Sequence, residues 1–163
     1  MRSRKADTAR MNKLFIALAI AAVAVSTARA ALDDTQQQIE KRYGQPVKEA
    51  TTVPPATYAA YYKQGEVTIF VAYIGGRAQY IKYSGKLETG DIEAILKANQ
   101  AGAQSWVKFS DRKGLLKPRM GQASSCWFCP GKSAEAHKGS GPKRTTFIEF
   151  ATDTWLKAKA ASF

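Results

Sequence analysis

Residues 66–83, EVTIFVAYIGGRAQYIKY, carry the clearest fold signal in the chain. Two runs rich in β-branched and aromatic residues flank Gly75 and Gly76, and a two-glycine turn between such runs is typical of a β-hairpin. In the first run, residues 67, 69, 71 and 73 share one strand face, and residues 68, 70, 72 and 74 share the other. Both faces carry apolar side chains, so we expect a strand that is central in a sheet or covered on both sides.

Further strand patterns extend outward from this hairpin. Upstream, the aromatic run at 58–62 and a turn at 63–65 predict a third strand of a meander, and residues 47–57 read as a connector or a weak edge strand. Downstream, residues 105–109, 115–119 and 145–150 are further candidates. Together they predict a mostly antiparallel sheet of about four to six strands.

Two helices frame the meander. Residues 31–45 have a loose helical spacing, Asp33, Asp34 or Thr35 can cap the start, and Gly44 and Pro46 end the helix. Residues 87–99 form the best amphipathic pattern, with Thr89 as the expected N-cap and Ile92, Ile95 and Leu96 on the face that should pack on the sheet.

The C-terminal part has a less regular pattern. Residues 154–161 predict a short last helix, with Thr152 or Asp153 as its cap. Residues 120–143 are rich in Gly, Ser, Lys and Pro and lack a period, which predicts a mobile loop. The sequence shows no internal repeat. We therefore expect one small α+β domain over residues 31–163: a mostly antiparallel β-meander sheet with an N-terminal helix and one amphipathic helix packed on it.

The leading segment predicts export. Twelve apolar residues, 14–25, follow the basic residues Arg10 and Lys13, and the small residues Ala28 and Ala30 complete an A-x-A site. This is the pattern of a signal peptide over residues 1–30, and Met11 is an alternative start. An uncleaved anchor is the other interpretation, but a spanning helix needs about 20 apolar residues. We expect a periplasmic or secreted protein with no transmembrane span after cleavage.

Cleavage would change the charge of the protein. Residues 1–30 hold six of the 25 basic and one of the 13 acidic residues, so the net charge would fall from +12 to +7. The remaining excess could solubilise the protein or bind an anionic surface such as lipid headgroups or acidic polysaccharide. Export makes nucleic acid the least favoured of these partners.

Cys126 and Cys129, the only cysteines, are the candidate functional pair. In an exported protein they predict a local disulfide. The alternative is a redox pair, although a thioredoxin-like motif follows the first strand of a βαβ unit and opens a long helix, and this one does neither. A metal site would need His137 and Glu135 as well, because structural zinc takes four ligands.

No catalytic set, metal site or cofactor motif emerges from the remaining residues. His137, the only histidine, has polar neighbours and is expected to be exposed in the loop. Several tyrosines and two lysines could form a ligand-stacking face, although cross-strand tyrosines more often pack within a sheet. These residues are Tyr58, Tyr61, Tyr62, Tyr73, Tyr80, Tyr83, Lys63 and Lys82.

The order of motifs resembles a group of small exported bacterial proteins of unknown function. Over residues 32–110 the likeness rests on the helix end KRYGQP at 41–46, on the turn at Gly75-Gly76-Arg77, and on the spaced residues Ile92, Ile95, Leu96, Asn99 and Trp106. A looser similarity is to SmpA/OmlA-type envelope lipoproteins, which also run from a helix through Gly-x-Pro into antiparallel strands. This chain lacks their lipidation cysteine after the signal peptide. Neither resemblance implies an active site.

The sequence therefore favours a non-enzymatic binding or interaction module of the cell envelope, whose partner is an envelope protein or an anionic surface. The alternatives are a thiol–disulfide oxidoreductase that uses Cys126 and Cys129, and a binder of anionic envelope components through the basic loop region.

Overall fold

The computed structural model describes residues 32–52, 54–100, 105–109, 125–141 and 145–162. The predicted signal peptide and the strand candidate at 115–119 lie outside the described residues. None of the helices within the described ranges is long and apolar enough to cross a membrane.

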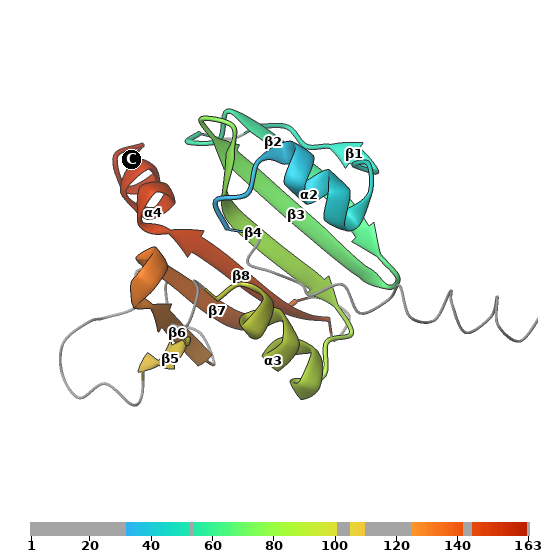
Figure 1. The fold of residues 1–163 in the computed structure, drawn as a ribbon, viewed down its shortest axis with the longest axis vertical. Coiled ribbons are helices and arrows are strands. Elements are labelled where there is room, and N and C mark those ends of the chain that lie inside the picture. The colour runs from blue at the N-terminus through green and yellow to red at the C-terminus, as the bar shows by residue number, and fades with distance from the viewer. Residues whose placement is uncertain (1–31, 53, 101–104, 110–124, 142–144, 163) are drawn as a thin grey trace, which may run out of the picture.

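One antiparallel sheet of eight strands organises the molecule (Figure 1). Its strand order is β1-β2-β3-β4-β8-β7-β6-β5. The strands are β1 (Lys48–Glu49), β2 (Tyr58–Gln64), β3 (Val67–Ile74), β4 (Arg77–Gly85), β5 (Val107–Lys108), β6 (Ser125–Cys129), β7 (Ala134–Ser140) and β8 (Thr146–Thr152). The helices are α2 (Gln36–Tyr43), α3 (Thr89–Ala98) and α4 (Asp153–Ala160), with a 3₁₀ turn η3 (Pro130–Lys132). The α+β class is confirmed, and the sheet has more strands than the predicted four to six.

The sheet has a repeated arrangement that the sequence does not reveal. A helix followed by a four-strand meander occurs twice, first as α2 with β1 to β4 and then as α3 with β5 to β8. The last strands of the two meanders, β4 and β8, pair in the middle of the sheet, and the short strands β1 and β5 form its two edges. The two halves thus share one hydrogen-bonded sheet.

The hairpin at Gly75 and Gly76 forms as predicted, since β3 pairs with β4 across these two residues. Both glycines have positive φ, 59° and 75°, which glycine adopts without the penalty of a Cβ atom. The predicted meander is also confirmed, because β2 pairs with β3 along its whole length.

The helix ends follow from local hydrogen bonds. Thr35 caps α2: its side chain accepts from the Gln38 backbone, and the Gln38 side chain accepts from the Thr35 N–H at 2.8 Å. Gly44 ends the helix with φ 83°. The α3 helix is capped one residue earlier than predicted, because Glu88 and Asp91 form its capping box in place of a Thr89 cap.

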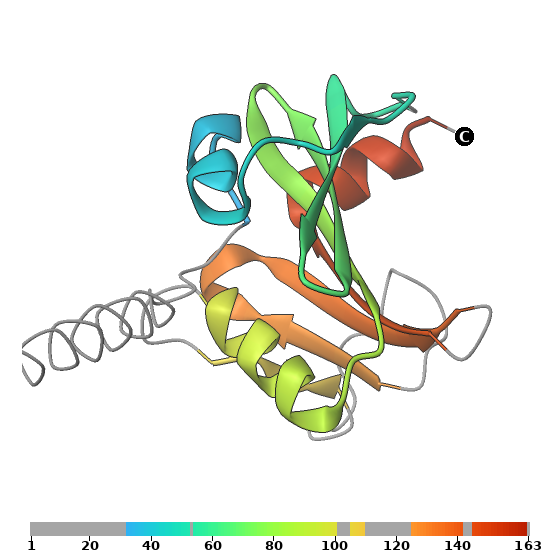
Figure 2. The same ribbon diagram turned by 90° about the vertical axis from the view of Figure 1, so that its right-hand side faces the viewer.

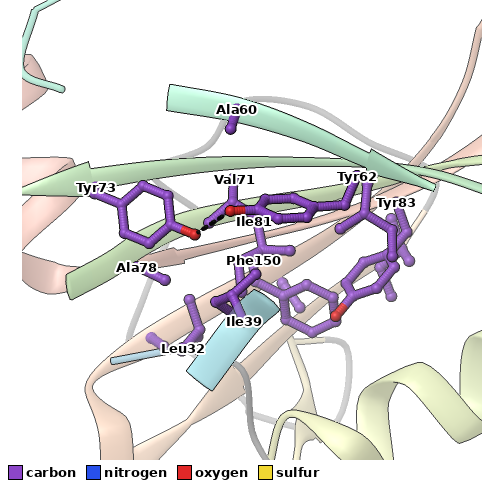
Figure 3. Packing of buried hydrophobic residues seen from close by; sticks show 14 of the residues in the cluster. Leu32, Ile39, Ala60, Tyr62, Val71, Tyr73, Ala78, Ile81, Tyr83 and Phe150 are labelled. Atoms are coloured by element: carbon purple, nitrogen blue, oxygen red, sulfur yellow. Dashed lines mark hydrogen bonds between the residues drawn. The ribbon is translucent and has the colours of Figure 1, made fainter. Parts of the chain in front are cut away.

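Both α2 and α3 cover the same face of the sheet, and α4 lies on the other side (Figure 2). The main core fills the covered face. Ile39 of α2 and Ile92 of α3 are buried there with alternate residues of β3. The Tyr62 and Tyr73 hydroxyls bond each other at 3.0 Å inside this core, so both buried hydroxyl groups have a partner (Figure 3).

Residues 120–143 differ from the predicted loop, because they include strands β6 and β7 and the turn η3. The physical reason lies in β7. Its core-facing positions are the small residues Ala134 and Ala136, while the polar Glu135 and His137 are buried on the opposite face. The strand therefore contains none of the β-branched or large aromatic residues that identify strands in a sequence, and alanine, glycine and glutamate are uncommon in strands.

Candidate functional site on the open face of the sheet

We call the sheet face opposite α2 and α3 the open face. A row of six residues runs across this face from strand to strand. Each residue is directly opposite the next one on the neighbouring strand. Directly opposite residues of antiparallel strands point to the same face. This cross-strand row consists of Tyr61, Phe70, Lys82, Glu149, His137 and Cys126. It brings together residues as far apart in the sequence as Tyr61 and Glu149.

The first two residues of the row are aromatic, and two neighbouring rings outside the row extend them. The rings of Tyr61 and Phe70 lie 5.1 Å apart, and Phe70 meets Tyr80 edge-on at 6.0 Å. Tyr80 in turn stacks on Trp155 of α4 at 5.1 Å. These spacings are typical of favourable aromatic pairs. The four rings form a continuous aromatic wall, and α4 supplies its end.

A hollow of about 340 Å³ lies against this wall. The residues that line it are Tyr61, Thr68, Phe70, Tyr80, Lys82 and Ser84. A volume of this order suits a small ligand, and aromatic walls with a few polar groups are the usual lining of such sites.

Lys82 supplies the positive charge of the hollow. Its Nζ lies 3.7 Å from Glu149 Oε2 and 4.0 Å from the centroid of the Phe147 ring. The Phe147 ring is itself seated over Gly139, where an added Cβ would collide with it. The Lys82 side chain keeps 34% of its surface exposed. The ammonium group is therefore positioned by its neighbours and still accessible to a ligand.

Glu149 links the hollow to the second half of the row. Its carboxylate accepts a hydrogen bond from the Tyr80 hydroxyl and lies 3.1 Å from His137 Nδ1. Burial, and then the charge of Glu149, raise the pKa of Tyr80 well above its usual range. Tyr80 therefore stays protonated at neutral pH and remains a donor to Glu149.

The prediction that His137 is an exposed loop residue is wrong. His137 lies in β7, and only 6% of its surface is exposed. An ionised carboxylate only accepts hydrogen bonds, so Nδ1 carries the proton shared with Glu149. The other ring nitrogen, Nε2, is buried and has no hydrogen-bond partner among the described residues. A buried polar atom without a partner is uncommon and marks this position as a candidate site.

The two cysteines do not lie together. Both are in β6, where positions three apart point to opposite faces. Cys129 is fully buried beside Ala134 on the core face, while Cys126 lies opposite His137 on the open face and is partly exposed. Within the described residues, which include both cysteines, there is no disulfide. The predicted pair is thus two separate thiols in this structure.

The alternative metal set is not assembled either. Cys129 faces away from His137, and the described residues contain no group of three His, Cys, Asp or Glu residues that could hold a metal ion. The predicted tyrosine face is divided in the same way. Tyr61 and Tyr80 line the hollow on the open face, whereas Tyr62, Tyr73 and Tyr83 are buried in the core.

Sequence reasoning missed Phe70, Glu149 and His137 as members of one site. The two-glycine turn is a local signal for the pairing of β3 with β4, but on its own it would place Phe70 opposite Ile81. A register shift between Ala72 and Tyr73 pairs Phe70 with Lys82 instead. The pairing of β4 with β8 and of β8 with β7 has no such local signal.

A scan against protein-family models found no match, and neither did a search of curated proteins. Among solved structures, a cysteine-rich secretory protein from Staphylococcus aureus subsp. aureus Mu50 is similar at 11% identity with a TM-score of 0.46. The alignment covers 77% of this chain and 46% of that protein, so the chain spans less than half of its length. A similarity at this level carries no inference about function.

Proposed function

We propose that the protein is an exported binding module of the cell envelope, and that the hollow on the open face binds a carboxylated, ring-bearing ligand such as an acidic sugar unit. The observation that carries the proposal is the aromatic wall of Tyr61, Phe70 and Tyr80 beside the accessible ammonium of Lys82.

The chemistry of the lining sets the ligand class. The aromatic rings offer apolar surface to one flat face of a ligand ring. Thr68 and Ser84 add hydroxyl groups that can donate to or accept from ligand hydroxyls. Lys82 attracts a carboxylate, and its 3.7 Å contact with Glu149 is long enough to be exchanged for a closer one.

The leading segment supports the export half of the proposal. Its basic flank, its apolar core and its A-x-A site match a signal peptide, and the chain after Ala30 retains a net charge of +7. Acidic polysaccharides of an envelope are attracted to a protein of this charge.

The test is a calorimetric titration of residues 31–163 with a short oligogalacturonate, with a neutral maltooligosaccharide of equal length as the control ligand. We expect binding to the acidic sugar that weakens with salt, since contacts between exposed charges are screened. Lys82→Gln should reduce the affinity about tenfold, which corresponds to the loss of one charge-assisted contact.

The matched control is Lys97→Gln on α3, which removes the same charge from the opposite side of the molecule. We expect this variant to bind like the unmodified protein. Equal binding of both sugars, or equal effects of both lysine variants, would contradict the assignment of the hollow.

A further inference from the structure

Three chemically active side chains occupy adjacent strands at the other end of the cross-strand row. Cys126 of β6 is directly opposite His137 of β7, and His137 is directly opposite Glu149 of β8. Directly opposite residues have Cβ atoms about 4.5–5.5 Å apart. The Cys126 thiol and the imidazole ring therefore lie on the same face of the sheet, on neighbouring strands.

The hydrogen bond to Glu149 selects the tautomer of a neutral His137 ring. With the Nδ1 proton donated at 3.1 Å, a neutral imidazole carries its lone pair on Nε2. On the side of β7 away from Glu149, the residue directly opposite His137 is Cys126 of β6. His137 is more than nine-tenths buried, and Nε2 has no partner among the described residues. In the neutral ring, Nε2 can therefore accept a proton from a nearby donor.

We propose that Cys126 is a reactive thiol site, activated by His137 and positioned to form a mixed disulfide with a low-molecular-weight disulfide. His137 Nε2 takes the thiol proton, and the resulting thiolate attacks one sulfur of the disulfide. A bond forms between Cys126 Sγ and that sulfur as the original S–S bond breaks. The departing thiolate takes the proton from His137, so no further oxidant or reductant is needed.

The mixed disulfide on Cys126 should persist, because the second cysteine of β6 lies on the opposite face of the strand. Cys129 points into the core, so it is not placed to attack the mixed disulfide and release the adduct. The site therefore ends at one adduct per chain, which distinguishes it from a two-cysteine oxidoreductase. It uses a different part of the open face from the hollow and does not depend on what the hollow binds.

Several charged or titratable groups face this site, and each influences its dependence on pH. Glu149 from β8 is hydrogen-bonded to His137, and Tyr80 and Lys82 from β4 contact the same carboxylate. Glu135, two residues before His137 on the same face of β7, is a further buried acid. Cys126 is the facing group from β6.

The test is the reaction of residues 31–163 with 2-hydroxyethyl disulfide, followed by intact mass and by the rate between pH 5 and 9. We expect a single adduct, located on Cys126 by peptide mapping. The rate should level off well below pH 8.5, the ordinary pKa of a thiol. Cys129→Ser should react like the unmodified protein, and Cys126→Ser should give no adduct.

His137→Gln tests the role of the ring. It should slow the reaction at pH 7 by about tenfold and move the rise of the rate to about pH 8.5, where an unassisted thiol ionises. A rate and pH profile unchanged by His137→Gln would overturn the proposal. Should that variant fail to fold, the profile of Cys129→Ser alone decides: a rise centred near pH 8.5, or an adduct on Cys129 in the unmodified protein, also overturns it.

Discussion

At the residue scale, Glu149 is the centre of the open face. Its carboxylate joins Tyr80 and Lys82 of β4 to His137 of β7, and only 14% of its side chain is exposed. A carboxylate removed from water needs such donors to offset the loss of hydration. The positions of these side chains on the open face therefore depend on their contacts with Glu149.

Tyr80→Phe removes one donor to Glu149 and keeps the ring that stacks on Trp155. We expect the free energy of unfolding to fall by about 1.5–3 kcal/mol, because a hydrogen bond to a charged group is lost. Urea unfolding measures this change. Tyr61→Phe, which removes a hydroxyl from the same face, is the control and should change stability by no more than about 0.5 kcal/mol. Equal effects would refute the special role of the Tyr80 hydroxyl.

The buried tyrosines predict how stability depends on alkaline pH. Burial raises the pKa of Tyr73, Tyr80 and Tyr83 above the ordinary value of 10.0. In the unfolded chain these groups ionise near pH 10, while in the folded protein they stay protonated to higher pH. Their contribution to stability is thus complete below pH 10 and is lost as the pH rises above it.

Urea midpoints measured from pH 8 to 11.5 should be level at first and then fall. Each such tyrosine adds about 1.4 kcal/mol per pH unit to the slope above pH 10. Tyr73→Phe should therefore flatten the slope. Tyrosinate absorbance that reports all tyrosines ionising near pH 10 in the folded protein would be inconsistent with this explanation.

Only some residues of the open face could be predicted from the sequence. Tyr80 and Lys82 could be named from the sequence, because they lie in a clear strand pattern. His137 could not be recognised as a buried residue, since the core face of its strand is built from Ala134 and Ala136. Its partner, Glu149, lies on a strand that pairs through tertiary contact alone.

At the element scale, local chemistry explains most of what could be predicted. The β3–β4 hairpin and the C-terminal end of α2 follow from glycines with positive φ, and the start of α2 follows from a threonine cap. These signals lie within a few residues of each other, so the sequence displays them directly. The edge strand β1 was predicted as one alternative for its segment.

Thr35→Ala tests the cap of α2. The substitution removes the side-chain oxygen that accepts from Gln38 N and should destabilise the protein by about 1 kcal/mol. Urea unfolding is again the measurement, with Gln37→Ala at an exposed position of the same helix as the control. A loss of stability as large in the control as in Thr35→Ala would show that the capping box contributes little.

The Cys126–Cys129 motif lies in strand β6, and the strand conformation determines whether the two thiols can meet. In a turn or at the start of a helix, two cysteines three residues apart can meet, but in a strand their side chains point to opposite faces. The Cys126–Cys129 spacing therefore gave no guide to its function until the strand was known. The η3 turn that follows spans only three residues.

At the scale of the whole molecule, the pairing of β4 with β8 creates the open face. It joins the two helix-and-meander halves and aligns the aromatic residues of the first with Glu149, His137 and Cys126 of the second. The sequence carries no local trace of this pairing, because it depends on how two complete meanders meet. For the same reason, the α+β class was predictable but the eight-stranded sheet was not.

We propose that the open face is the binding surface, and a backbone amide chemical-shift map can test this proposal. Residues 31–163 would be titrated with the short oligogalacturonate. We expect saturable shifts concentrated at Tyr61, Phe70, Tyr80 and Lys82, around the hollow. Shifts confined to α2 and α3 on the opposite side, or no shifts at all, would contradict it.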